Sequence, residues 1–125
     1  VTWAEQPQWS TPLSPLRVWP APPHPALDQD ALQALVRGPW RVSPQSNRLG
    51  VRLQGAPLPR RGTDGLLPAP MCRGAVQVAT DGTPMILGPD HPATGGYPVV
   101  AVVEPASLAA LARVPAGAQV EFVLV

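Results

Sequence analysis

The hydrophobic residues of this chain recur mostly with a period of two, in short stretches separated by glycine, proline and polar residues. Alternation with this period is typical of β-strands that bury one face. The predicted strands cover residues 49–53, 75–79, 84–87, 97–103 and 120–124. Asp81-Gly82 lies between two of them and suits a tight hairpin turn, because glycine tolerates positive φ.

Two segments show the 3.6-residue spacing of helices instead. The first runs from Asp28, a good N-cap residue, to Arg37, and Gly38-Pro39 ends it. The second starts at Pro105, which suits the first helical position, and continues to about residue 113. Short strands, frequent turns and two short α-helices predict a mainly-β fold, a closed or nearly closed β-barrel.

Residues 1–25 are rich in proline and are interpreted as a linker or wrapping arm with one short strand at 16–19. Proline has no backbone donor, so we expect neither a long helix nor a central strand there. Trp19 is expected to pack onto a folded body. Residues 26–125 would form the barrel domain, with a long loop over 60–70. Because the chain starts with valine, we expect it to be part of something longer.

Composition narrows the function. A length of 125 residues fits one domain, and 45% hydrophobic with 14% charged residues excludes a disordered chain. The net charge of +1 gives no electrostatic case for nucleic acid or an anionic membrane. All basic residues are arginine, which excludes a Schiff-base lysine. The single Cys72 allows neither an internal disulfide nor a metal site, and no signal or membrane-spanning segment is found, so cytoplasm is the default compartment.

Candidate chemistry gathers in two loops. In residues 43–50, Gln45, Ser46 and Asn47 offer donors and acceptors, and Arg48 offers a cationic fork for a carboxylate or phosphate. The alternative is a turn in which Ser46 and Asn47 bond their own backbone. From the residues alone this local alternative is favoured.

The second loop covers residues 90–98. Asp90 supplies a carboxylate, Thr94 and Tyr97 supply hydroxyls, and the Gly95-Gly96 pair allows close backbone approach. A plain glycine turn capped by Asp90 is an equally good interpretation.

One polar residue also interrupts a predicted strand. Gln77 must point opposite to Val76 and Val78, toward a groove or, more commonly, solvent.

These groups are predicted to converge at one end of the barrel. Asp90, Arg48 and Gln77 are the candidate catalytic residues. The candidate substrate-binding residues are Ser43, Gln45, Ser46, Asn47, Thr94, Gly95, Gly96 and Tyr97. No metal site is predicted.

The motifs, taken in order, resemble one family. They are Leu16-Arg17-Val18, residues 43–50, residues 74–78, residues 81–87 and residues 90–98. The chain resembles the biotin-dependent carboxyltransferase family that includes allophanate hydrolase subunit 2, KipA and the C subunit of 5-oxoprolinase, whose members are about twice this length. The resemblance identifies it with the C-terminal half of such a protein.

The resemblance implies a cyclophilin-like β-barrel. It implies two protein partners, the N-terminal half of the same polypeptide and a KipI-like protein (the B subunit of 5-oxoprolinase), and a small amide or lactam substrate. The implied function is a contribution to ATP-dependent 5-oxoproline hydrolysis or a related amide or carboxyl transfer. ATP would be used by the complex rather than bound here, and biotin enters only in a urea carboxylase-like interpretation. No activity is expected from the chain alone.

Departures from the family pattern favour a second hypothesis. Pro92-Ala93 replace a Gln-Thr pair, and Ala69 and Pro70 stand where the family has an acidic residue and glycine. The lost hydrogen-bonding groups favour a KipA-like regulatory binding module that acts through a KipI-like partner without catalysis of its own.

Overall fold

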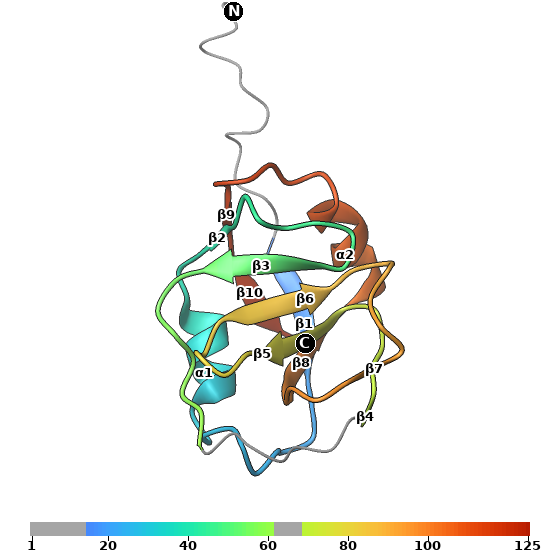
Figure 1. Ribbon diagram of the computed structural model, residues 1–125. Helices are drawn as coiled ribbons and strands as arrows, with labels where there is room; N and C mark the ends of the chain where they lie inside the picture. The colour runs from blue at the N-terminus through green and yellow to red at the C-terminus, as the bar shows by residue number, and fades with distance from the viewer. Residues whose placement is uncertain (1–14, 62–68) are drawn as a thin grey trace, which may run out of the picture.

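The computed structural model describes residues 15–61 and 69–125, and ten strands and two helices lie within them. The strands are β1 (Leu16–Pro20), β2 (Trp40–Val42), β3 (Gly50–Gln54), β4 (Ala69–Pro70), β5 (Ala75–Val78), β6 (Pro84–Leu87), β7 (Thr94–Gly95), β8 (Val99–Val103), β9 (Gln119–Val120) and β10 (Phe122–Leu124). Eight of them form one sheet in the order β10-β1-β8-β5-β6-β3-β2-β9. The remaining two, β4 and β7, form a separate antiparallel ribbon (Figure 1).

The eight-stranded sheet curls into a nearly closed barrel. The strands at its two ends, β9 and β10, are consecutive in sequence and separated only by Glu121. A single extended segment therefore pairs with β2 on one side and with β1 on the other. The predicted β-barrel with two short helices is confirmed, and the predicted runs over 49–53, 75–79 and 120–124 belong to one sheet.

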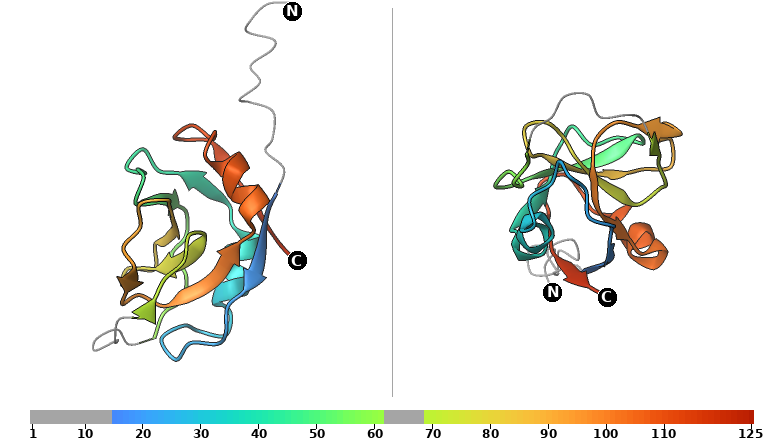
Figure 2. Two further views of the ribbon diagram at one scale, coloured as in Figure 1. Left: turned by 90° about the vertical axis from the view of Figure 1, so that its right-hand side faces the viewer. Right: turned by 90° about the horizontal axis from the view of Figure 1, so that it is seen from below.

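The helices begin or end within a few residues of their predicted limits. Helix α1 covers Ala31–Arg37, and the N-cap position belongs to Asp30 rather than the predicted Asp28. The Asp28 carboxylate accepts a hydrogen bond from the Asp30 amide. This bond belongs to a turn that precedes the helix, so the helix begins at Ala31. Helix α2 covers Pro105–Leu111, with proline at its start as predicted. Seen from below, the two helices lie on opposite sides of the strands (Figure 2).

The core contains the inward side chains of nearly every strand. Val76 and Val78 of β5 are fully buried, as the alternation predicts. Trp40 is buried at the start of β2, and its indole N–H donates to the Leu35 carbonyl at 2.8 Å. Trp40 and Val42 alternate with Arg41, but three residues are too few to indicate a strand, so this strand was not predicted. Leu49, by contrast, was predicted inside and is 50% exposed, because β3 begins one residue later.

The proline-rich region contains a central strand, so the expectation that it could not is wrong for residues 16–20. Strand β1 pairs with β10 on one edge and with β8 on the other. Pro15 precedes the strand and Pro20 is its last residue, so the amides of the residues between them remain available for pairing. Trp19 was expected to pack onto a folded body, but it is 44% exposed.

The prediction of a loop over residues 60–70 is wrong for its last two residues, and no observation tests it for residues 62–68. Ala69 and Pro70 form β4 and pair with Gly95 and Thr94 of β7. Residues 62–68 lie outside the described residues.

Candidate functional site

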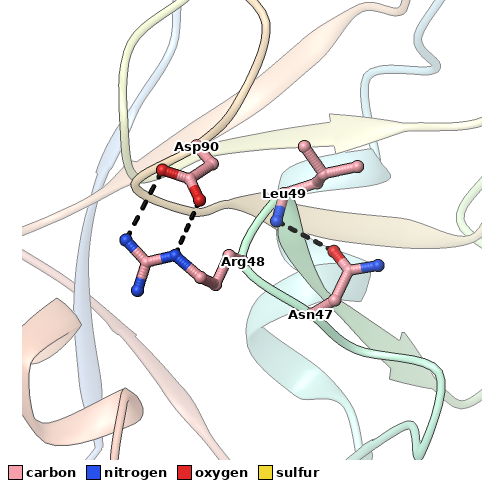
Figure 3. A network of polar contacts seen from close by, with 4 residues as sticks. All are labelled: Asn47, Arg48, Leu49 and Asp90. Carbon is pink, nitrogen blue, oxygen red and sulfur yellow. Dashed lines mark hydrogen bonds and ion pairs between the residues drawn. The ribbon is translucent and has the colours of Figure 1, made fainter.

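The two loops singled out in the sequence meet through an ion pair. Arg48 Nε donates to Asp90 Oδ2 at 2.6 Å, and Nη2 lies 3.4 Å from Oδ1 (Figure 3). The backbones are joined as well, since the Asp90 amide donates to the Arg48 carbonyl at 3.0 Å. A Cβ at Gly88 would lie 2.5 Å from that same carbonyl oxygen, so glycine is required for this close approach.

The pair lies in solvent. The side chains of Arg48 and Asp90 are 74% and 54% exposed. The hydrogen bond and the charge of Asp90 raise the pKa of Arg48, and the bond from Arg48 lowers the pKa of the Asp90 carboxyl. Exposed pairs contribute little to stability because water and salt screen them. A second anion can therefore reach the guanidinium of Arg48 from solvent.

The other polar residues of the first loop bond mostly to backbone. Asn47 Oδ1 accepts the Leu49 amide at 2.8 Å, which Figure 3 also shows. Ser46 Oγ accepts the Arg52 amide at 3.0 Å, and the buried Ser43 Oγ accepts the Gln45 amide at 3.1 Å. The local-turn interpretation is thus confirmed for Asn47, and Ser43 behaves likewise, whereas Ser46 bonds the backbone of Arg52 in strand β3. Gln45 is exposed.

Arg48 borders a cavity of about 390 Å³ between helix α2 and strands β3 and β6. We call it the arginine pocket. Arg73 is its second cationic residue, and Ser46 and Asn47 also line it. Its apolar walls are Val42, Val51, Ile86, Leu87, Leu108, Leu111, Ala112 and Val114. The arginine pocket thus combines positive charge with an apolar interior large enough for a small molecule.

Gln77 lies elsewhere, beneath the β4–β7 ribbon. It is only 7% exposed, and its Nε2 lies 3.5 Å from the Met71 sulfur. A Cβ at Gly95 would come within 2.5 Å of the same Nε2, so the ribbon covers this amide because residue 95 is glycine. Solvent was the commoner expectation for Gln77, and it is wrong because the ribbon covers the outer face of β5 at this point.

Met71 and Gly95 belong to the wall of a second cavity, of about 610 Å³. We call it the aromatic groove. It is lined by Trp19, Pro20, Ala21, Pro22, Pro23, His24, Ala69, Pro70, Met71, Cys72, Ala75, Gly95, Gly96, Tyr97, Pro98, Val99 and Val102. Tyr97 and Trp19 are 45% and 44% exposed, and Thr94 is exposed.

The structure therefore brings the predicted residues together in two groups. Arg48 lies with Asp90 at the arginine pocket, and Gln77 lies with Gly95 behind the wall of the aromatic groove. Neither cavity is lined by both Arg48 and Gln77.

Sequence reasoning missed three lining residues. Arg73 lies two residues before β5, a position that does not single it out, and nothing in the pattern marked Met71 or His24. Among the described residues, no group of three His, Cys, Asp or Glu side chains is placed to hold a metal ion. The described helices are all too short or too polar to cross a membrane.

Comparison with known protein families gives a match along nearly the whole chain. The model of the carboxyltransferase domain, subdomain A and B, matches residues 2–124. The C subunit of Escherichia coli 5-oxoprolinase is 40% identical over 108 residues, which are 86% of this chain and 35% of that protein. The protein of the same name from Haemophilus influenzae is 35% identical over 107 residues, again 86% and 35%. The chain thus spans about a third of the length of these curated relatives.

Several solved structures are also similar to this chain in both fold and sequence. TTHA0988 has a TM-score of 0.75 and 34% identity, over 91% of this chain and 22% of that chain. The urea amidolyase of K. lactis has a TM-score of 0.78 and 25% identity, over 88% of this chain and 7% of that one. The urea carboxylase of Kluyveromyces lactis has the same TM-score and identity, with 11% of its chain covered.

Proposed function

Because this chain belongs to the family of the carboxyltransferase domain, subdomain A and B, we propose that it is a substrate-binding part of a protein like the C subunit of 5-oxoprolinase. In that role it contributes to ATP-dependent 5-oxoproline hydrolysis, or to a related amide or carboxyl transfer, within a multi-subunit complex. The partners are the N-terminal remainder of the same polypeptide and a KipI-like protein, the B subunit of such a complex. The identity of 40% to the E. coli C subunit supports this proposal.

The single observation that carries the proposal is the Arg48–Asp90 pair at the rim of the arginine pocket. A guanidinium has five N–H donors in a planar fork, and Asp90 engages only Nε and Nη2. Arg48 Nη1 has no hydrogen bond to the described residues, and Figure 3 shows it turned away from Asp90. The remaining donors can hold the carboxylate of 5-oxoproline while Asp90 keeps the guanidinium in place.

The residues of the arginine pocket then have distinct roles. Arg48 binds the carboxylate directly, and Arg73 adds positive charge on the same cavity. The apolar walls receive the ring methylenes of the lactam. Asp90 orients Arg48. Gln77 does not line the arginine pocket, so it holds the β4–β7 ribbon through Met71 and Gly95 instead of binding substrate there. Bond cleavage is assigned to the assembled complex, which uses ATP; biotin enters only if the reaction is of the urea carboxylase type.

A KipA-like regulatory binding module is the second candidate, and one observation favours it. Both charged candidates, Arg48 and Asp90, are exposed, and most of the surrounding side chains bond backbone. Such a surface can bind without catalysing. The two candidates differ in one respect, because only the first makes turnover of a complex depend on Arg48.

A chimera tests the proposal. This chain would replace the matching 108 residues of the E. coli C subunit, and the chimera would be assembled with the E. coli partner proteins. We expect ATP-dependent release of glutamate from 5-oxoproline, reduced about tenfold or more by Arg48→Gln, since the variant loses the charge-assisted hydrogen bonds to the substrate carboxylate. Arg61→Gln is the matched control, because Arg61 lies outside the arginine pocket. Equal activity of the Arg48→Gln and Arg61→Gln chimeras would refute the role of Arg48. Chimeras that assemble but show no turnover would favour the regulatory module.

A further inference from the structure

The lining of the aromatic groove contains no charged side chain. The chain has nine arginines and eight acidic residues, yet none of those described reaches this cavity. A charged ligand would lose hydration there and gain no opposite charge, which is costly. The groove therefore fits an uncharged ligand.

Its polar side chains offer hydrogen-bond donors. The Trp19 indole N–H and the Tyr97 hydroxyl make no hydrogen bonds to the described part of the chain. His24 Nδ1 accepts the Ala26 amide at 3.0 Å, so a neutral His24 carries its proton on Nε2. Three donors of this kind call for a ligand with several acceptors.

The groove is also rigidly built. Its floor is the outer face of the barrel, where Trp19 of β1 is paired with Val102 of β8, and Val102 with Ala75 of β5. Five prolines line the cavity: Pro20, Pro22, Pro23, Pro70 and Pro98. Since proline has no N–H and a fixed φ, these walls offer few backbone donors and resist deformation.

We propose that the aromatic groove binds an extended, uncharged, proline-containing segment of a partner protein. A prolyl amide presents a carbonyl acceptor and no N–H, so such a segment matches a groove rich in side-chain donors. Polyproline II has no internal hydrogen bonds, and its rings dock on aromatic side chains such as Trp19 and Tyr97. This inference is independent of the proposed 5-oxoproline site, because it uses neither Arg48 nor the arginine pocket.

The test uses a capped, neutral peptide of about nine residues that repeats alanine-proline-proline, titrated into the full chain and followed by calorimetry and two-dimensional NMR. We expect saturable binding that weakens at least about tenfold in Trp19→Ala, as for truncation of an aromatic hot spot. Tyr97→Phe, which removes only the hydroxyl, should weaken binding less. Leu49→Ala is the matched control, since Leu49 is equally exposed but does not line the groove.

Two further probes define the ligand class. A capped glycine-serine peptide of the same length and a version carrying glutamates should both bind at least about tenfold more weakly than the proline peptide. Equal binding of the three peptides, equal affinity of Trp19→Ala with a native-like NMR spectrum, or no binding would overturn the proposal. So would a dimer of this chain that forms through Trp19 and excludes the peptide, because the occupant would then be a second copy.

Discussion

The arginine pocket and the aromatic groove lie on the same barrel, yet their polar groups are used in opposite ways. In the loop beside the arginine pocket, Ser46 and Asn47 bond backbone, and Asp90 neutralises part of Arg48. In the groove, the donors of Trp19 and Tyr97 make no bonds to the described residues. The polar loop thus leaves one charged donor, the Arg48 guanidinium, available to a ligand. The apolar groove leaves several uncharged donors available.

This difference shows that a count of polar residues in a motif says little about binding. What matters is which donors and acceptors the fold leaves unpaired. Residues 43–50 form a motif because their side chains stabilise the turn that places Arg48 at the arginine pocket. The groove has almost no polar motif, but Trp19 of β1 and Tyr97, in the segment before β8, are both exposed along it.

The largest contrast between the two regions is expected from adding a methyl group to each of two glycines. A Cβ at Gly88 would lie 2.5 Å from the Arg48 backbone oxygen, which cannot move without separating the two loops. Gly88→Ala should therefore lower the free energy of unfolding by about 1–3 kcal/mol, the usual cost of overpacking, and should break the Arg48–Asp90 pair. Urea unfolding and the NMR signal of Arg48 Nε report both effects.

Gly95→Ala is the matched variant in the groove wall. Its Cβ would also meet an atom at 2.5 Å, but that atom is Gln77 Nε2, the end of a flexible side chain. The loss of stability should be smaller than for Gly88→Ala. An equal or greater loss would show that the ribbon over Gln77 is as rigid as the joined loops.

A smaller effect is expected from the turn that presents Arg48. Asn47→Ala removes the bond to the Leu49 amide and should cost about 1 kcal/mol of unfolding free energy. Gln45→Ala, at an exposed neighbour in the same loop, should cost much less. Both variants should bind the proline peptide like the unmodified chain. Equal loss of stability in the two variants would contradict the role given to Asn47.

The smallest effect concerns pH. The bond from Arg48 lowers the pKa of Asp90, so its contribution to stability is present above the unfolded value of about 3.9 and is lost as pH falls through the folded value. The stability difference between the unmodified chain and Asp90→Asn should accordingly shrink in acid and in high salt. Because the pair is exposed, the difference should be small throughout. A stability difference between the two proteins that grows as pH falls would contradict this prediction.

Much of the fold could be predicted because period-two alternation reports burial directly. Val76 and Val78 are buried as the pattern predicts, and Arg48 and Asp90, which were predicted to converge at one end of the barrel, form an ion pair. Helix limits were missed by a few residues, since Asp28 and Asp30 are equally good caps and only the local turn decides between them.

The arrangement around Gln77 could not be predicted. Its burial depends on a ribbon formed by Ala69-Pro70 and Thr94-Gly95, two dipeptides far apart in sequence and without any alternation. The separation of Gln77 from Arg48 has the same cause, because the ribbon places Gly95 over β5 while Asp90 stays beside Arg48. Asp90 and Gly95 are thus near in sequence, yet Asp90 pairs with Arg48 of the arginine pocket and Gly95 lines the aromatic groove.

One NMR experiment tests the central claim that ligand carboxylates are held at the arginine pocket and not in the aromatic groove. The backbone and side-chain signals of the full chain would be followed during titration with 5-oxoproline. We predict saturable shifts at Arg48, Arg73 and Asp90, lost in Arg48→Gln, with the Trp19 indole signal unchanged. Shifts centred on Trp19 and Tyr97 and retained in Arg48→Gln would contradict the account.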